Sequence, residues 1–447
     1  MLRMAAEQSN AAATAPTLAR LVSLDAYRGF VMLAMVSHSF GLPAVARELA
    51  NRQDQHLAFW QQLAYQFDHV QWPGCVFWDL IQPSFMFMVG TAMAFSCAAR
   101  RAKGQSYWVM ALHAAWRAVA LILLGVFLRT EIKPDPDNPG GIPLTNFTFV
   151  DVVSQIGFGY FFLFLLWGRR QWVLLLVALA ILFSYWALFA SYPLPEPGFN
   201  YEKVGVPADW EYNYPHIPPD ADFQAHWNKN TNPASDFDVW FLNQFPRTKP
   251  FEFNSGGYAT LNFIPSLVTM IFGLMAGQML LGPATYLKPR DELPHVQREA
   301  HVRSSKEKFG LLLLGGLAGL VIGYLLHISG VCPAVKRIWT PTWTIYSTGW
   351  TLIMLAAFYG IIELANFRWW AFPLAVVGMN SIAIYVLDKL TREWIVDRLQ
   401  VHLGGKIFTL YGLVDSAFAP LVQSLIVMAL LWLVMYWMYR RKIFLKI

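Results

Sequence analysis

The feature that most constrains this chain is a succession of about ten long apolar runs, each close to the ~20 residues that an α-helix needs to cross a bilayer. Hydrophobic residues make up 56% of the 447 residues and charged residues only 14%, whereas a soluble domain carries about a quarter charged residues. Backbone polar groups inside a bilayer need internal partners, so such runs fold as helices. The sequence therefore predicts an all-α, polytopic integral membrane protein with about ten transmembrane helices.

These runs divide the chain into a short tail and one membrane domain. Residues 1–19 are rich in Ala, Thr and Ser and are expected to be disordered. Residues 20–447 are expected to form the transmembrane domain, with outer loops at 43–75 and 192–257. The predicted spans are 22–42, 76–98, 107–128, 148–167, 171–191, 258–281, 309–328, 342–363, 370–388 and 415–438.

Basic residues set the orientation of these spans. Lys and Arg gather in alternate connections, which the positive-inside rule places in the cytoplasm. Both termini are then cytoplasmic, and the loops 43–75 and 192–257 face outward from what we expect to be a bacterial inner (plasma) membrane. The loop 389–414, with its basic residues on the outer side, fits least well. The cytoplasmic groups are Arg100, Arg101 and Lys103, then Arg169 and Arg170, the segment Lys288–Lys308, and Arg440, Arg441, Lys442 and Lys446.

One stretch, residues 69–90, concentrates the candidate chemistry and reads HVQWPGCVFWDLIQPSFMFMVG. His69 lies in the loop before the second span and Asp79 lies just inside it, while Pro83 interrupts the apolar run and Gly90 closes it. A histidine and a carboxylate at a membrane edge can handle a proton together. Asp79 either orients the imidazole or binds a substrate hydroxyl, or it caps the second span at its N-terminus.

The third span contains charged residues that require an explanation, because inserting a charged side chain at the bilayer centre costs roughly 2.5–3.5 kcal/mol. Arg117 lies about 15 Å from the cytoplasmic face at 1.5 Å per residue. His113 lies one turn nearer the cytoplasm on the same face. The pair either lines a cavity that receives an anionic or polar ligand from inside, or it is buried against a carboxylate such as Glu363 or Asp25.

Further polar side chains are distributed from the inner to the outer leaflet. Arg28 lies at the inner end of the first span, where an ion pair with Asp25 is favoured over catalysis. Asn380 lies near mid-depth of the ninth span, and His38 and Ser39 lie at the outer end of the first. Such a series indicates either a transporter or an enzyme whose two substrates meet from opposite sides of the membrane.

Two other features have weaker implications. The outer loop 192–257 is rich in Pro, Asn and aromatic residues, which suits either a sugar ligand or an ordered cap without a ligand. The three cysteines match no metal-ligand spacing, so no metal is expected, and Cys75 and Cys332 are interpreted as small apolar residues rather than a disulfide. The net charge of +6 is explained by the cytoplasmic groups, so no nucleic-acid partner is expected.

The ordered set of motifs is similar to that of a known family. The chain resembles the heparan-α-glucosaminide N-acetyltransferases, the transmembrane acetyltransferases, and their bacterial relatives nearly from end to end. Each segment alone is weakly specific, but their order is specific. The matching segments are SLDAYRGF, HVQWPGCVFWDLIQPSFMFMVG, AWRAVALILLG, ATLNFIPSLVTMIFGLMAG, VKRIWTPTW, GMNSIAIYV and the closing YRRKIF.

The resemblance implies transfer of an acetyl group from cytoplasmic acetyl-CoA to the amine of an amino sugar or glycan terminus on the outer side. It makes His69 the catalytic residue, with Trp72 and Gly74 in register, and places Arg117 along the path of the CoA. The expected partners are therefore acetyl-CoA, the acceptor and the lipid bilayer, and a homodimer is an arrangement common in such families. The predicted catalytic set is His69, Asp79, Ser39 and His38, and the predicted substrate-binding set is Trp72, Arg117, His113, Arg28 and Asn380.

Two departures from the family pattern affect the expected mechanism. Ser39 stands where the family has Asn, so stabilisation of the acyl oxygen is weaker or is supplied by His38. Ser154 and Gln155 stand where the family has a Gln-Arg pair. Direct transfer and a route through acetyl-His69 stay open, as do two other functions: a transporter or flippase of a glycan or lipid-linked sugar, and O-acetylation of a cell-surface polymer.

Overall fold

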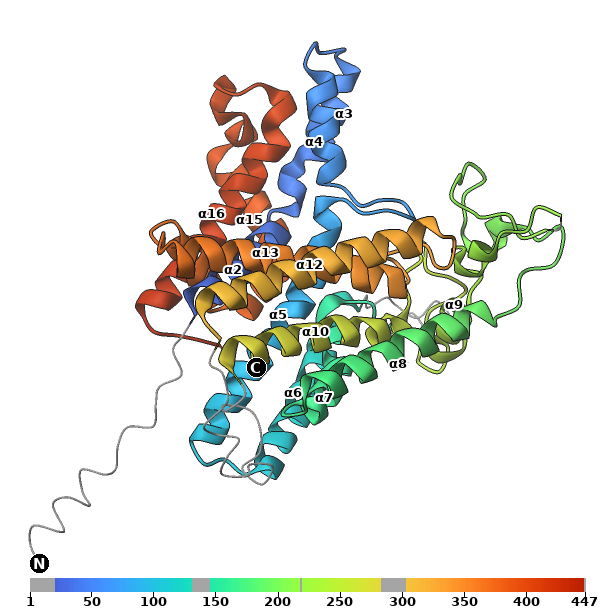
Figure 1. Ribbon diagram of the computed structural model, residues 1–447. Helices are drawn as coiled ribbons and strands as arrows, with labels where there is room; N and C mark the ends of the chain where they lie inside the picture. Colours follow the sequence, from blue (N-terminus) through green and yellow to red (C-terminus); the bar gives the residue numbers. More distant parts are fainter. Residues whose placement is uncertain (1–20, 131–144, 218, 283–302, 446–447) are drawn as a thin grey trace, which may run out of the picture.

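The computed structural model describes residues 21–130, 145–217, 219–282 and 303–445, and these form an all-α membrane protein (Figure 1). Within these ranges the sole extended pairing is an isolated bridge between Pro73 and Val335. The helices are α2 (Val22–Val36), α3 (Leu42–Asn51), α4 (Leu57–Gln66), α5 (Ile81–Ala102), α6 (Tyr107–Arg129), α7 (Val152–Leu166), α8 (Gln171–Ala190), α9 (Pro233–Leu242), α10 (Phe263–Leu281), α12 (Ser305–Ile328), α13 (Pro341–Tyr359), α14 (Ala371–Gly378), α15 (Ser381–Leu403) and α16 (Ala419–Arg440).

Every predicted span corresponds to a helix or to a bent pair of helices. Among the described residues, seven helices are long and apolar enough to cross a membrane, and two bent pairs bring the number to nine. In the first pair α2 is followed by His38–Asn51 at 45°, and in the second α14 is followed by α15 at 78°. The remaining predicted span is α7, whose 15 residues fall short of the ~20 that a straight span needs.

The predicted tail 1–19 and most of the segment Lys288–Lys308 lie outside the described residues. Two predicted loops prove to contain helices. The loop 43–75 holds most of α3 and all of α4, and α15 continues to Leu403, well into the predicted loop 389–414. In this extension of α15, Arg392 donates to Val36 O at the end of α2 at 3.2 Å and lies 3.7 Å from Asp388.

At the centre of the molecule α5 packs against α10. In the most apolar part of each of these two helices, 72% of the residues are buried. A Cβ atom on Gly90 would lie 1.9 Å from Met270 O, and one on Gly273 would lie 2.0 Å from Phe87 O. Helix α5 continues past Gly90, in agreement with the predicted span 76–98, and uses this glycine for close packing. Pro83 interrupts the apolar run of the sequence but not the helix, since it lies in the first turn, where no intrahelical N–H bond is required.

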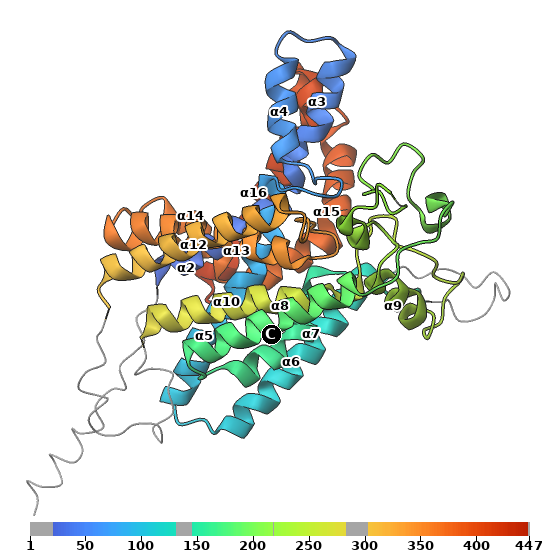
Figure 2. The same cartoon turned by 45° about the vertical axis from the view of Figure 1, so that its right-hand side comes forward.

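Helices α3, α4, α15 and α16 project together from one side of the molecule, as both views show (Figures 1 and 2). An ion pair of 2.8 Å between Arg52 at the end of α3 and Asp415 before α16 ties the tip of this arm together. At another end of the molecule, the segment 192–257 with α9 follows α8 and precedes α10 (Figure 1).

The segment 192–257 is ordered by its own amide side chains. Asn228 bonds both Tyr214 N and Tyr214 O, and Asn230 donates to Val204 O and Asn254 O. Asn232 caps α9. The amide groups that could have suited a sugar are therefore largely occupied within the segment, which makes it an ordered cap over the end of the bundle.

Candidate active site

His69 and Asp79 are brought together by the turn that precedes α5. Asp79 lies in a 3-10 turn, Phe77–Leu80, that leads into α5. His69 lies in the irregular loop after α4, and the amide of Val70 donates to Asp79 Oδ2 at 3.4 Å. His69 Nδ1 is 2.7 Å from Asp79 Oδ1. The side chain of His69 is 37% exposed and that of Asp79 only 1%, so a buried carboxylate supports an accessible imidazole.

A third charged residue, Lys336, joins this pair from a distant part of the chain. The bridge between Pro73 and Val335, and the hydrogen bond from Gly74 N to Ala334 O at 2.9 Å, hold the two loops side by side. Lys336 Nζ is 3.1 Å from Asp79 Oδ1 and 3.1 Å from His69 Nδ1. The side chain of Lys336 is 5% exposed. The three residues form a compact charged cluster, which we call the outer triad after the side of the membrane on which the sequence predicts it.

The surroundings of the outer triad disfavour a charged imidazole. Burial lowers the pKa of His69, the neighbouring ammonium of Lys336 lowers it further, and Asp79 opposes both effects. His69 is therefore neutral at pH 7. Its hydrogen bond to Asp79 assigns the ring proton to Nδ1, which leaves Nε2 available as a proton acceptor.

Trp72, predicted to bind substrate, lies inside the protein rather than at its surface. Its side chain is fully buried, and its Nε1 donates to Trp227 O at 3.0 Å. Its ring packs edge-on against Trp210 at 6.1 Å. Trp72 thus attaches the loop of His69 to the cap formed by residues 192–257.

His38 and Ser39 lie in a turn at the end of α2 in which both residues have positive φ, at 46° and 59°. His38 Nε2 is 2.8 Å from Asp388 Oδ2, and the imidazole is 42% exposed. This is a second histidine–carboxylate pair. Phe40 of the same turn packs against Phe67 at 5.9 Å, so the turn adjoins the loop that carries His69.

A second group of predicted residues, His113 and Arg117, lies in the first half of α6, and Arg100 in the last turn of α5 contacts His113. Arg100 donates to His113 Nε2 at 2.6 Å. The guanidinium of Arg117 lies over the ring of Tyr160 at 5.0 Å, and its buried Nε has no hydrogen-bond partner. In the described part of the chain no carboxylate pairs with Arg117. We call Arg100, His113 and Arg117 the inner basic cluster.

The remaining predicted residues have structural contacts. Arg28 donates to Asp25 Oδ1 at 2.9 Å and to Gly378 O, which joins α2 to the end of α14. Asn380 is buried at the break between α14 and α15. It donates to Ile443 O at 3.0 Å and accepts from Leu445 N at 3.0 Å, so it holds the segment after α16 against this break.

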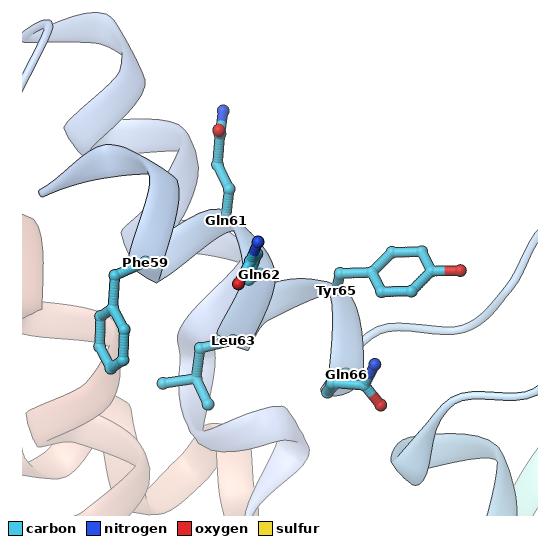
Figure 3. Close-up of a pocket in the computed structure, with 6 residues that line it drawn as sticks. All are labelled: Phe59, Gln61, Gln62, Leu63, Tyr65 and Gln66. Carbon is cyan, nitrogen blue, oxygen red and sulfur yellow. The ribbon is translucent and has the colours of Figure 1, made fainter.

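The cysteines and the surface hollows contribute no further chemistry. Cys75 and Cys332 are free, and burial raises the pKa of the Cys75 thiol to about 12. No group of His, Cys, Asp or Glu within the described ranges is arranged to hold a metal ion. A surface hollow of about 560 Å³ lies on α4, but its lining side chains splay away from one helix and do not converge (Figure 3).

Sequence reasoning brought His69 and Asp79 together but did not select Lys336 or Arg100. Lys336 appeared only as part of the segment VKRIWTPTW, and Arg100 only as a residue of a basic loop. A lysine next to a span most often extends its amine to water. Without the bridge between Pro73 and Val335, nothing indicated that this one is buried.

Known proteins were compared with the chain as a whole. No family model matches it. It is 23% identical to human heparan-alpha-glucosaminide N-acetyltransferase and 22% identical to the mouse protein of the same name, over 96% of this chain in each case. The chain is related to these proteins. It spans 60% of their length, and the relationship confirms the resemblance seen in the motifs.

Proposed function

We propose that this protein is a transmembrane acetyltransferase that transfers the acetyl group of cytoplasmic acetyl-CoA to an amine of an amino sugar or glycan on the outer side of a bacterial plasma membrane. The activity would reside in a single domain, residues 20–447. The observation that carries the proposal is the outer triad: an accessible neutral imidazole hydrogen-bonded at 2.7 Å to a buried carboxylate. The names of the two relatives agree with it.

In this proposal His69 acts as the general base. The acceptor amine attacks the thioester carbonyl carbon, and Nε2 of His69 takes the proton that the nitrogen loses. The C–S bond then breaks, and the CoA thiolate leaves and takes the proton from the His69 imidazolium, which gives the thiol and the neutral base again. General-base assistance of this kind contributes roughly 10²–10⁴ in rate. Asp79 orients the ring and stabilises the imidazolium that forms transiently.

The acetyl-CoA would enter at the opposite end of α5. There Arg100 and Arg117 approach His113 and Tyr160 without a pairing carboxylate in the described residues. Arg100 and Arg117 are half-buried, and the buried Nε of Arg117 has no hydrogen-bond partner, so cations held here without a carboxylate favour an anionic ligand. We propose that the inner basic cluster binds the phosphate groups of acetyl-CoA and that the pantetheine arm extends along α5 towards His69.

The turn that carries His38 and Ser39 would contribute at the acyl oxygen. Ser39 has one hydroxyl to donate, and His38 is already hydrogen-bonded through Nε2 to Asp388. The contact between Phe40 and Phe67 places this turn next to the loop of His69. In this proposal Ser39 donates to the thioester carbonyl, and His38 holds the turn in its left-handed conformation.

The direct test compares purified wild type with His69→Ala, using release of CoA from acetyl-CoA with glucosamine as the acceptor. The matched control is His56→Ala, because His56 is an exposed loop histidine whose hydrogen-bonded neighbour is Gln55. We expect turnover to fall at least 10²-fold in His69→Ala and to be unchanged in His56→Ala. Equal turnover in folded wild type and His69→Ala would refute the catalytic assignment.

The same preparation distinguishes the two chemical routes. Wild type mixed with acetyl-CoA alone would accumulate an acetylated His69 peptide, detectable by mass spectrometry, only if the reaction passes through acetyl-His69. Transport of a glycan into proteoliposomes without acetyl-CoA, together with no release of CoA, would favour the transporter instead.

A further inference from the structure

Among the lysines that the structure describes, Lys336 is unusual because its amine is buried against two other ionisable groups. The residue is 4% exposed, and its Nζ lies 3.1 Å from both Asp79 Oδ1 and His69 Nδ1. A lysine that only filled space would extend its amine to solvent. The amine is instead held where it contacts the carboxylate and the ring together.

The charges of the outer triad allow only some protonation states. An ionised Asp79 and an ammonium at Lys336 balance one another. A proton added to His69 would place a second cation against the same carboxylate oxygen, because Oδ1 is the atom that both Nδ1 and Nζ contact. Arg337 adds a further positive charge nearby, where its guanidinium donates to Gly256 O at 2.8 Å.

We infer that Lys336 is a positioning residue for His69: its ammonium, held between Asp79 and the ring, keeps the imidazole neutral, while the hydrogen bond to Asp79 leaves Nε2 as the proton-accepting atom. Asp79 Oδ1 is nearer to Nδ1 than Lys336 Nζ is, at 2.7 Å against 3.1 Å, so Nδ1–H donates to Asp79. The inference deepens the proposed function, on which its catalytic meaning rests.

The inference gives Lys336 a part in each turnover. When Nε2 takes a proton from the acceptor, the ring becomes an imidazolium 3.1 Å from an ammonium. Repulsion between like charges favours rapid loss of that proton. Lys336 thus limits the lifetime of the charged ring and restores the neutral base for the next cycle, without transferring a proton itself.

The test measures the titration of His69 directly. Of the two protonation states of histidine, diethyl pyrocarbonate modifies only the neutral one. Mass spectrometry of peptides gives the rate at His69 as a function of pH, with exposed His56 of the same sample as reference. In wild type we expect the half-point of the His69 profile to lie below that of His56. In Lys336→Met we expect it to rise by about one pH unit or more.

Three further variants separate the charge of Lys336 from its packing. Lys336→Gln keeps a hydrogen-bond donor for Asp79 but removes the charge, and its His69 half-point is expected to rise as in Lys336→Met. This variant therefore still tests the charge if Lys336→Met does not fold. Lys336→Arg keeps the charge and is expected to retain the low half-point. Lys229→Met removes a comparably buried lysine, 3% exposed, that contacts Trp210 instead of His69, and is expected to leave the profile unchanged.

A wild-type half-point at or above that of His56 would overturn the inference, and so would an unchanged profile in Lys336→Met or Lys336→Gln. The measurement needs no acetyl transfer. A protein without acetyltransferase activity but with the expected shift would disprove the proposed function alone, whereas an active enzyme without the shift would disprove the role of Lys336 alone.

Discussion

Asp79 and Lys336 are buried charges that compensate one another, at 1% and 5% side-chain exposure. Removing one partner leaves the other uncompensated, which typically costs about 3–5 kcal/mol, whereas replacing both by neutral groups is close to neutral. We therefore expect Asp79→Asn to lower the free energy of unfolding by about 3 kcal/mol. Asp79→Asn combined with Lys336→Met is expected to recover most of it, as measured by thermal unfolding in detergent. Equal losses in the single and double variants would contradict the pairing.

The position of His69 next to Lys336 also gives the pH dependence a sign. Burial and the ammonium of Lys336 hold the pKa of His69 below its usual value of 6.5. In the proposed mechanism the neutral ring is the base, so activity should persist below pH 6.5 and fall only as the pH approaches the lowered pKa. Stability follows the same direction, because the unfolded state binds the proton more readily and folding weakens as pH falls below 6.5.

The rate of CoA release at saturating substrate from about pH 5 to pH 8 checks this expectation. An acid limb centred above pH 6.5 would contradict it. The matched comparison is Lys336→Arg, in which the retained charge should leave the acid limb in place.

At this scale the sequence predicted the pairing of His69 with Asp79, because both residues lie in one short stretch. The third member could not be predicted, since Lys336 is more than 250 residues away from both and reaches them only through the bridge between Pro73 and Val335. Trp72 shows a second limit of prediction from sequence, which concerns the direction of a side chain. Its place in a motif indicated a site, but whether its ring faces a ligand or the core depends on the cap at 192–257.

At the scale of elements, the contact between α5 and α10 depends on glycine. A Cβ on Gly273 would lie 2.0 Å from Phe87 O, and the backbone oxygen cannot move away without displacing the helix. We expect Gly273→Ala to cost about 1–3 kcal/mol through overpacking. Gly310→Ala in α12 is the control, because nothing lies within 4 Å of its added Cβ and helix propensity favours alanine by up to about 1 kcal/mol. Thermal unfolding of both variants measures this difference in stability, and similar melting temperatures would contradict the packing argument.

A second prediction at the scale of elements concerns Asp238 in helix α9. Asp238 is 2% exposed, and its Oδ2 accepts a hydrogen bond of 2.9 Å from the amide of Thr260, just before α10 begins. Burial raises its pKa from 3.8 to about 6. Because the pKa of the folded state is above that of the unfolded state, the protonated acid stabilises the cap fully below pH 3.8, and this stabilisation is lost as pH rises through about 6.

Asp238→Asn removes the ionisable group while its amide oxygen can still accept from Thr260 N. The difference between the pKa of Asp238 in the unfolded and folded states corresponds to about 3 kcal/mol in the free energy of unfolding. We expect the variant to be more stable than wild type at pH 8, by up to this amount, and to match wild type near pH 4. Melting curves at several pH values provide the measurement, and a variant less stable than wild type at pH 8 would contradict this view of Asp238.

The elements themselves were largely predictable, because apolar runs of spanning length leave the backbone few alternatives to a helix. Their bends were not. The 78° break between α14 and α15 occurs where Asn380 binds Ile443 and Leu445, a contact across more than 60 residues. The extension of α15 to Leu403 was hidden because its charges resemble those of a loop.

At the scale of the whole molecule, the outer triad and the inner basic cluster lie at opposite ends of α5, since Asp79 precedes its first residue and Arg100 lies in its last turn. An acetyl group delivered at one end and used at the other must pass along the bundle. The proposed reaction, in which acetyl-CoA comes from the cytoplasm, requires Arg100 to face the cytoplasm and His69 to face outward.

This orientation can be tested with two matched substitutions at exposed glutamines. Gln55→Cys lies between α3 and α4, on the side of His69, and Gln105→Cys lies between α5 and α6, beside Arg100. With Cys75, Cys97 and Cys332 replaced by alanine, a membrane-impermeant maleimide added to intact cells should label Gln55→Cys. It should label Gln105→Cys only after the membrane is permeabilised, because the positive-inside rule places the adjoining basic residues in the cytoplasm. The reverse pattern would put the outer triad on the cytoplasmic side, and transfer across the membrane would then have to be abandoned in favour of a reaction confined to one face.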